Sequence, residues 1–269
     1  MSAHYRTLFG LTKEPFGSEL DLSELLKTPD LLAAKERFDY AIRLGAMALV
    51  TGEIGSGKST ALRYASGQLH PSEYRSLYIT ASSGSILEIY RQILAELAIE
   101  TAGSSRAIMT RLIKREIQEL VQGKKIKVVL IIDEASLMRL EVFSELHTIA
   151  QFDKDSKAWL PIILAGQNNL TDKLMYRASM PLASRIVARS HLEGVNRDDM
   201  EQYIKHHLAI AGVKQNPFEE SAITAIHQGS GGLFRKANHL ARGALVAAAR
   251  EKSNTVTAEH VRLASTEIF

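Results

Sequence analysis

The sequence contains no cysteine, a single tryptophan and six prolines among its 269 residues. Without cysteine there is no disulfide bond, no thiolate nucleophile and no cysteine-ligated zinc or iron–sulfur cluster. It contains no run of about 18 apolar residues, the length needed to span a bilayer as a helix. Residues 1–11 lack the apolar segment of a secretory signal. We therefore expect a cytoplasmic protein that does not insert into a membrane.

Neither sign of charge is in large excess. The chain has 33 Lys and Arg and 30 Asp and Glu, which gives a net charge of +3. Hydrophobic residues make up 45% of the chain and charged residues 23%. This composition excludes disordered, collagen-like and low-complexity proteins and predicts a substantial core. The small positive balance is compatible with nucleic-acid binding, but by itself it favours an ordinary solvated surface.

Short apolar segments alternate with helical patterns over the first two thirds of the chain. The expected strands are residues 46–50, 77–81, 128–132, 162–165 and, more weakly, 187–191. The expected helices between them are residues 58–69, 86–97, 108–121 and 141–152. Continuous apolar strands that alternate with helices predict an α/β fold, with a parallel five-stranded sheet flanked by helices.

After about residue 195 only helical patterns remain. The expected helices are residues 198–211, 219–227, 233–250 and 258–267. Glycine, proline and Ser-Asn breaks separate them, and Thr257 is a suitable N-cap for the last one. We predict three parts: an N-terminal segment (1–45), an α/β core (46–194) and a small all-helical lid domain (195–269).

Residues 52–59 (GEIGSGKS) match the pattern G-x-x-x-x-G-K-[ST] at every position, between an expected strand and an expected helix. In such a loop, consecutive backbone N–H groups point inward and glycines allow close wrapping around a phosphate. Lys58 would meet the β and γ phosphates of ATP, and the Ser59 hydroxyl would ligate Mg²⁺. The predicted nucleotide-binding residues of this loop are Gly52, Glu53, Ile54, Gly55, Ser56, Gly57, Lys58, Ser59 and Thr60.

The apolar strand 128–132 ends in two carboxylates, Asp133 and Glu134. After a phosphate loop, such a pair is typical of a Walker B element. Asp133 would hold Mg²⁺ directly or through water, and Glu134 would orient and deprotonate the attacking water. The pair predicts an ATPase, and a nucleotide-bound scaffold with little turnover remains the alternative.

With these motifs the sequence resembles the AAA+ ATPases, and more narrowly the ATPase module of the ExeA/GspA type. The landmarks of the resemblance follow the family order over nearly the whole chain. They are residues 9–11 with 15–16, 51–60, 131–135, 164–167, 182–186 and 231–238.

The resemblance implies roles for three further residues and a ring or filament of copies of the chain. Gln167 would be the polar sensor 1, ahead of Asn168, although an amide that caps the next helix is the alternative. Arg185 would be the arginine finger that reaches a neighbouring subunit. Arg189, or a simple surface role for Arg185, remains possible. Arg235 would be sensor 2, although Phe234 stands before it where the family usually has proline.

The resemblance does not decide in which biological process the protein acts. In the ExeA/GspA type a transmembrane segment and a peptidoglycan-binding domain follow the ATPase module, and neither occurs before Phe269. We therefore expect a freestanding protein similar to the IstB, MuB and TnsC helpers, which assemble on duplex DNA with ATP and activate a transposase. The candidate contacts to DNA phosphates are Arg111, Lys114, Arg115, Lys124 and Lys125. The alternative is a secretion-assembly ATPase that binds secretion components and not DNA.

Overall fold

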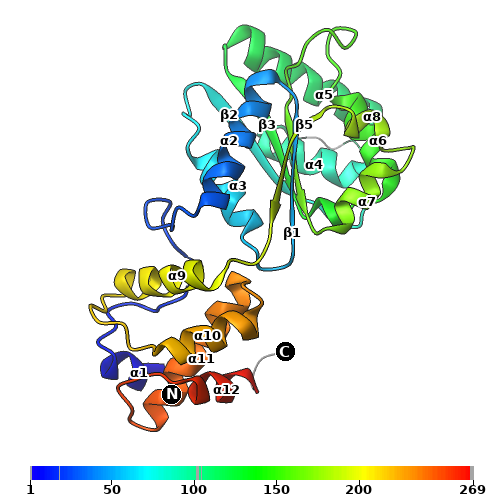
Figure 1. Cartoon of the computed structure of the whole chain (residues 1–269). Coiled ribbons are helices and arrows are strands. Elements are labelled where there is room, and N and C mark those ends of the chain that lie inside the picture. Colours follow the sequence, from blue (N-terminus) through cyan, green and yellow to red (C-terminus); the bar gives the residue numbers. More distant parts are fainter. Residues whose placement is uncertain (1, 18, 101–102, 104, 267–269) are drawn as a thin grey trace. The chain divides into compact units, whose positions relative to one another are not determined.

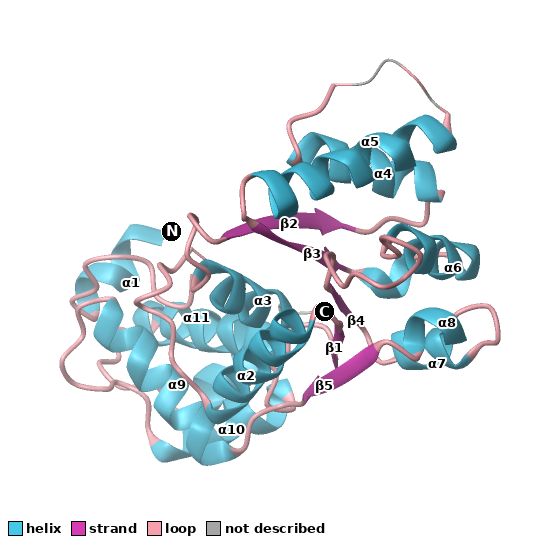
Figure 2. Cartoon of the chain, turned by 90° about the horizontal axis from the view of Figure 1, so that it is seen from above, coloured by secondary structure: helices cyan, strands magenta, loops and turns pink. Residues whose placement is uncertain are grey.

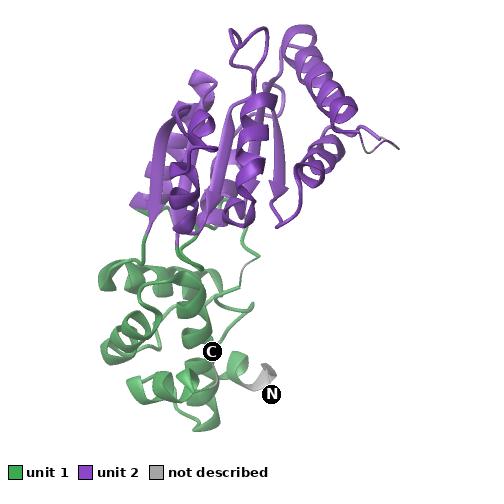
Figure 3. Ribbon diagram, turned by 90° about the vertical axis from the view of Figure 1, so that its right-hand side faces the viewer, with its two compact units in different colours: residues 1–28, 53–57, 193–269 green, residues 29–52, 58–192 purple. Residues whose placement is uncertain are grey.

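A computed structural model describes residues 2–17, 19–100, 103 and 105–266. Its elements fall into two compact units (Figure 3). The sheet unit comprises residues 29–52 and 58–192, and the helical unit comprises residues 1–28, 53–57 and 193–269. Glu267, the last residue of the predicted final helix, lies outside the described residues. Within that described part, none of the helices combines the length and apolarity needed to cross a bilayer.

The sheet unit is built on five parallel strands in the order β2-β3-β4-β1-β5 (Figure 2). They are β1 (Met47–Gly52), β2 (Tyr74–Thr80), β3 (Lys127–Asp133), β4 (Ile162–Gly166) and β5 (Ile186–Leu192). The predicted parallel five-stranded sheet is confirmed. Because all neighbouring strands are parallel, their carboxyl ends lie along one edge of the sheet, the usual place for a ligand site in such folds.

Helices cover both faces of this sheet. Helices α2 and α3 lie on one side, and α4 to α8 lie on the other (Figure 2). The helices are α2 (Pro29–Leu44), α3 (Lys58–Gly67), α4 (Ile86–Glu96), α5 (Arg106–Gln118), α6 (Leu140–Ile149), α7 (Asn169–Met175) and α8 (Met180–Ala183). A short π-helix (Glu119–Gly123) follows α5, and a 3₁₀ helix (Ala135–Leu137) follows β3.

The burial pattern explains why these segments form layers. Every residue of β1 and β4 is buried, as expected for inner strands covered on both faces. Helix α4 is covered on one stripe only, with apolar residues at helical spacing. The buried residues of α4 are Ile86, Ile89, Tyr90, Ile93 and Leu94.

The helical unit contains α1 (Ser2–Leu8), α9 (Arg197–Ile210), α10 (Glu220–Ser230), α11 (Phe234–Arg250) and α12 (Ala258–Ser265) (Figure 1). Small residues dominate the buried face of α11, which allows α10 and α12 to pack against it. The buried residues of α11 are Ala237, Leu240, Ala241, Ala244, Leu245, Ala247, Ala248 and Ala249.

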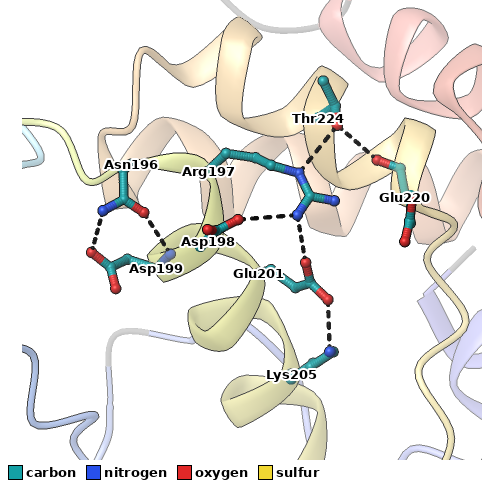
Figure 4. A network of polar contacts seen from close by, with 8 residues as sticks. All are labelled: Asn196, Arg197, Asp198, Asp199, Glu201, Lys205, Glu220 and Thr224. Carbon is teal, nitrogen blue, oxygen red and sulfur yellow. Dashed lines mark hydrogen bonds and ion pairs between the residues drawn. The ribbon is translucent and has the colours of Figure 1, made fainter.

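A polar network fastens α9 to α10 (Figure 4). Asn196 caps α9, because its side-chain oxygen accepts a hydrogen bond from the backbone N–H of Asp199 at 2.9 Å. Arg197 donates to Glu201 on its own helix at 2.7 Å and to the Thr224 hydroxyl on α10 at 3.4 Å. Arg197 therefore has a structural role between two helices.

The N-terminal segment packs into the core of the helical unit. Phe16 is 2% exposed and stacks on His207 of α9, with ring centroids 5.5 Å apart. The backbone N–H of Thr12 donates to the carbonyl of Ala211 at 2.8 Å, and Arg242 donates to the Phe16 carbonyl at 2.8 Å. Residues 1–28 are thus part of the helical unit by their contacts, whereas α2 belongs to the sheet unit.

Candidate nucleotide-binding and hydrolysis site

The predicted phosphate loop joins β1 to α3, so its strand–loop–helix context is present. Lys58 is the first residue of α3, and it is 6% exposed. Its ammonium group donates a hydrogen bond to the carbonyl of Gly52 at 2.9 Å. A buried lysine is therefore held beside the start of the loop, at the edge of the sheet where β1 ends.

The loop itself adopts a backbone that glycine favours. Gly55 and Gly57 have φ angles of 86° and 98°, a region that residues with a Cβ rarely occupy. Between them, the Ser56 hydroxyl is buried and makes no hydrogen bond within the described residues. Leaving such a group without a partner costs free energy, and a phosphate oxygen bound in the loop would supply one. The loop therefore fits a phosphate group.

Within the helical unit, the start of α11 fits against this loop. The backbone N–H of Arg235 donates to the carbonyl of Gly55 at 3.3 Å. A Cβ on Gly55 would lie only 2.8 Å from the Cβ of Arg235, so this approach requires glycine. Phe234 packs its ring on that of Tyr203, with the ring centroids 4.6 Å apart. The backbone of the predicted sensor 2 thus contacts the loop, and its side chain is exposed.

Asp133 and Glu134 stand at the carboxyl end of β3. Asp133 is 6% exposed, and its two carboxylate oxygens accept hydrogen bonds from the Glu134 N–H and the Tyr78 hydroxyl, both at 2.8 Å. Burial, together with the Asp133 carboxylate, raises the pKa of the Tyr78 hydroxyl. Glu134 has φ 53° and ψ 30°, an uncommon left-handed conformation for a residue other than glycine. This turn directs the two consecutive side chains differently.

The turn after Glu134 is locked to the neighbouring strand and helix. Lys173 on α7 donates to the carbonyls of Ser136 and Met138 at 2.6 and 2.7 Å. A Cβ on Gly166, the last residue of β4, would lie 2.7 Å from the backbone nitrogen of Ser136. Glu134 is therefore carried by a turn with little freedom to move.

Gln167 follows β4 directly, which places it at the same sheet edge as Asp133. It is half-buried, and its amide makes no hydrogen bond within the described part of the chain. Asn168 is the N-cap residue of α7, and its side chain makes no capping bond. The geometry leaves the Gln167 amide available to a water or a phosphate.

Arg185 lies between α8 and β5 and is ion-paired within its own chain. One of its nitrogens donates to both carboxylate oxygens of Asp155, at 2.6 and 2.5 Å. This contact lowers the pKa of Asp155. Arg189, the alternative finger, is exposed on β5.

The basic residues considered for DNA lie on different elements. Arg111 and Arg115 are exposed on α5, where they line an open groove of about 540 Å³. Lys114 lines it too, but its ammonium donates to the carbonyls of Thr148 and Gln151 at 3.0 and 2.8 Å, at the end of α6. Burial lowers the pKa of Lys114.

Lys124 and Lys125 are exposed in the turn before β3. Arg111 and Arg115 therefore form the more organised basic surface, because they share one helix face.

Sequence reasoning did not find Tyr78, Asp155 or Lys173, although each contacts a predicted site residue or its turn. Only the fold brings these residues to their partners, and no local pattern marks them.

Comparison with known proteins finds a family that matches the core. Residues 42–174 match the AAA domain family, a range that holds the phosphate loop, Asp133, Glu134 and Gln167. The core of this chain is therefore similar to the AAA domain family.

The whole chain is 28% identical over 267 residues to General secretion pathway protein A of Aeromonas hydrophila. The match covers 98% of this chain and 48% of the relative, so the chain spans about half the length of the curated relative it matches. The predicted resemblance to the ExeA/GspA type is confirmed.

Solved structures share the fold at low identity. Cdc6p from Pyrobaculum aerophilum superimposes with a TM-score of 0.75 at 16% identity, covering 94% of this chain and 70% of that one. The Aeropyrum pernix ORC1 protein, solved in complex with DNA, gives 0.69 at 15%, covering 99% and 69%. The ORC2 protein of the same organism, in ADPNP–ADP complexes, gives 0.69 at 15%, covering 94% and 71%. These likenesses confirm the P-loop AAA+ fold with its helical C-terminal part.

Proposed function

We propose that this protein is an ATP-dependent switch that binds ATP with Mg²⁺ and hydrolyses it. The observation that carries the proposal is the end of β3. There the buried Asp133 carboxylate is fixed by one hydrogen bond on each oxygen, and Glu134 follows in a left-handed turn. Both residues lie at the sheet edge where β1 ends and the loop to Lys58 begins. The AAA domain match covers all three residues.

The loop residues 52–60 bind the phosphates through backbone N–H groups, and Lys58 adds a positive charge. Ser59 and Asp133 would hold Mg²⁺, and the ion would neutralise charge on the phosphate oxygens. Gln167 positions a water, and Glu134 accepts its proton. The water oxygen bonds to the γ-phosphorus while the bond from that phosphorus to the bridging oxygen breaks, which releases ADP and phosphate.

Equilibrium binding of a fluorescent ATP analogue tests the first half of the proposal. Lys58→Ala should abolish binding, because the loop keeps its N–H groups but loses the charge that faces the β and γ phosphates. Lys27→Ala, which removes an exposed lysine, is the matched control and should bind like the unaltered protein. Equal affinity in both variants would reject Lys58 as a phosphate ligand.

We further propose that copies of the chain assemble with ATP into a ring or filament in which Arg185 acts on the nucleotide of a neighbour. Oligomers are typical of AAA+ proteins, and the resemblance supports this role for Arg185. Since Arg185 is held by Asp155 in the single chain, assembly must exchange that carboxylate for phosphate.

For the biological process, a role beside secretion components has the better support, because General secretion pathway protein A aligns with 98% of the chain. The end of the given sequence at Phe269 does not separate the two processes, since the alignment covers only 48% of that relative.

ATP-dependent binding to duplex DNA, as a partner of a transposase, is the second candidate. The exposed Arg111 and Arg115 beside the groove on α5 favour it.

Fluorescence anisotropy with duplex DNA separates the two candidates. With a non-hydrolysable ATP analogue, the DNA role requires affinity that falls steeply with salt, because bound phosphates release their counterions. Replacing both Arg111 and Arg115 with alanine should then weaken binding equally for all sequences and flatten the salt dependence. The double replacement of Lys124 and Lys125, the other candidate contacts, is measured alongside and should weaken binding less, because these lysines do not line the groove. Absence of binding at low salt would reject the DNA role.

A further inference from the structure

Tyr78 reaches the predicted metal carboxylate from a neighbouring strand. Strand β2 pairs with β3 so that Tyr78 lies opposite Ile131 and Thr80 lies opposite Asp133. Because side chains alternate along a strand, Tyr78 and Asp133 project from the same face of the sheet. The Tyr78 hydroxyl donates to Oδ2 of Asp133 at 2.8 Å.

The hydrogen bond from Tyr78 adds to one from the backbone of Glu134. The N–H of Glu134 donates to Oδ1 of Asp133, so each oxygen has one donor. The carboxylate cannot turn about its own axis without breaking one of the two bonds. Each oxygen keeps a lone pair for a further contact. Asp133 is thereby presented in a single orientation.

We propose that Tyr78 is a positioning residue that aims Asp133 at Mg²⁺, an inference that rests on the proposed ATP and Mg²⁺ binding. Groups that hydrogen-bond a metal-binding side chain fix its orientation, and their loss typically lowers metal affinity about 10- to 100-fold. Tyr78 touches the carboxylate and acts through it, so its effect is on metal binding.

The strand supplies its own control. Tyr74 lies four residues earlier on β2, hence on the same face, at the end far from Asp133. Its hydroxyl accepts a hydrogen bond from Lys127 at 3.5 Å. Tyr74→Phe and Tyr78→Phe therefore remove the same atom from the same strand and keep both rings.

The experiment measures the affinity for a fluorescent ATP analogue during a Mg²⁺ titration and again in EDTA. Tyr78→Phe should raise the Mg²⁺ midpoint about 10-fold and leave the affinity in EDTA and the melting temperature within the range of Tyr74→Phe. Asp133→Asn, measured alongside, should raise the midpoint at least as far.

The outcomes distinguish this inference from the proposed function. If Asp133→Asn shifts the midpoint and Tyr78→Phe does not, Tyr78 has no positioning role and the proposed function stands. If Tyr78→Phe lowers the affinity in EDTA by the same factor as with Mg²⁺, the tyrosine supports the fold alone and the inference is overturned. If the unaltered protein shows no Mg²⁺ dependence, the metal site and the role of Tyr78 both fail.

Discussion

The cores of the two compact units are built from different kinds of contact. The core of the sheet unit is made of large aliphatic side chains, and strands β1, β3 and β4 are buried almost end to end. The core of the helical unit depends on alanines along α11 and on aromatic and polar contacts to the N-terminal segment, including a buried His207. The sheet unit therefore presents its proposed catalytic residues on a rigid edge. We expect the stability of the helical unit to depend on one buried aromatic ring and on pH.

This difference predicts two kinds of variant. Substitutions at the strand ends of the sheet unit should change turnover more than stability. Substitutions between the N-terminal segment and α9 should change stability first.

The largest effect is expected at Arg185. Arg185→Ala should leave ATP affinity unchanged and lower turnover about 10³-fold, the usual contribution of an arginine finger. Arg189→Ala is the control for the alternative finger and should have little effect. Turnover per subunit of the unaltered protein should also rise with protein concentration, as phosphate-release assays over a dilution series would show. A constant rate in a protein that stays monomeric would exclude action on a neighbour.

Next in size is the aromatic contact of the N-terminal segment. Phe16→Ala should destabilise the helical unit by about 3–5 kcal/mol, because it empties a site that is packed against His207 and Phe218. Phe9→Ala removes an only partly buried ring from the same segment and should cost less. Urea unfolding followed by circular dichroism measures both. Equal losses would mean that Phe16 does not anchor the segment.

A smaller, pH-dependent effect is expected at His207. Burial, with the nearby His206, lowers the pKa of His207 to about 4 in the folded state, against about 6.5 when unfolded. Between these values the unfolded chain binds the extra proton, so stability is complete above pH 6.5 and falls as the pH approaches 4. The full loss is about 3 kcal/mol.

Urea unfolding at pH 7, 5.5 and 4.5 would follow this loss, and His207→Phe should remove this part of the pH dependence. An unchanged pH dependence in that variant would show that other groups cause it.

The smallest effect is expected at Asp155. Asp155→Asn would remove the charge that holds Arg185 within its own chain. Because such exposed ion pairs are weak, turnover at low protein concentration should rise by at most about fivefold. Asp153→Asn, in the same turn, is the control. Lower turnover in Asp155→Asn would mean that Asp155 supports the finger.

The sheet and the phosphate loop could be predicted because their signals are local. An apolar strand before a glycine-rich loop and a strand ending in Asp133 and Glu134 are both visible in single segments. Helix α2 was not predicted, although Pro29 at its first position and Gly45 after its last residue, with φ 64°, are ordinary boundary signals. The predicted helices end a few residues away from the ends that the structure shows, because helix ends fray.

The contacts of Tyr78, Asp155 and Lys173 could not be predicted, because each joins residues at least 30 positions apart. For the same reason no pattern showed that residues 1–28 pack with the C-terminal helices. The three predicted parts of the chain, like the roles of Gln167, Arg185 and Arg235, stay predictions.

The most direct test of the central proposal is Glu134→Gln, which keeps the size and polarity of the side chain but removes its basicity. Phosphate release and ATP binding are measured on the same preparation. The account predicts affinity equal to that of the unaltered protein and phosphate release at least about 10²-fold slower, because the water loses its proton acceptor. Unchanged phosphate release, or a loss of binding as complete as that of Lys58→Ala, would contradict it.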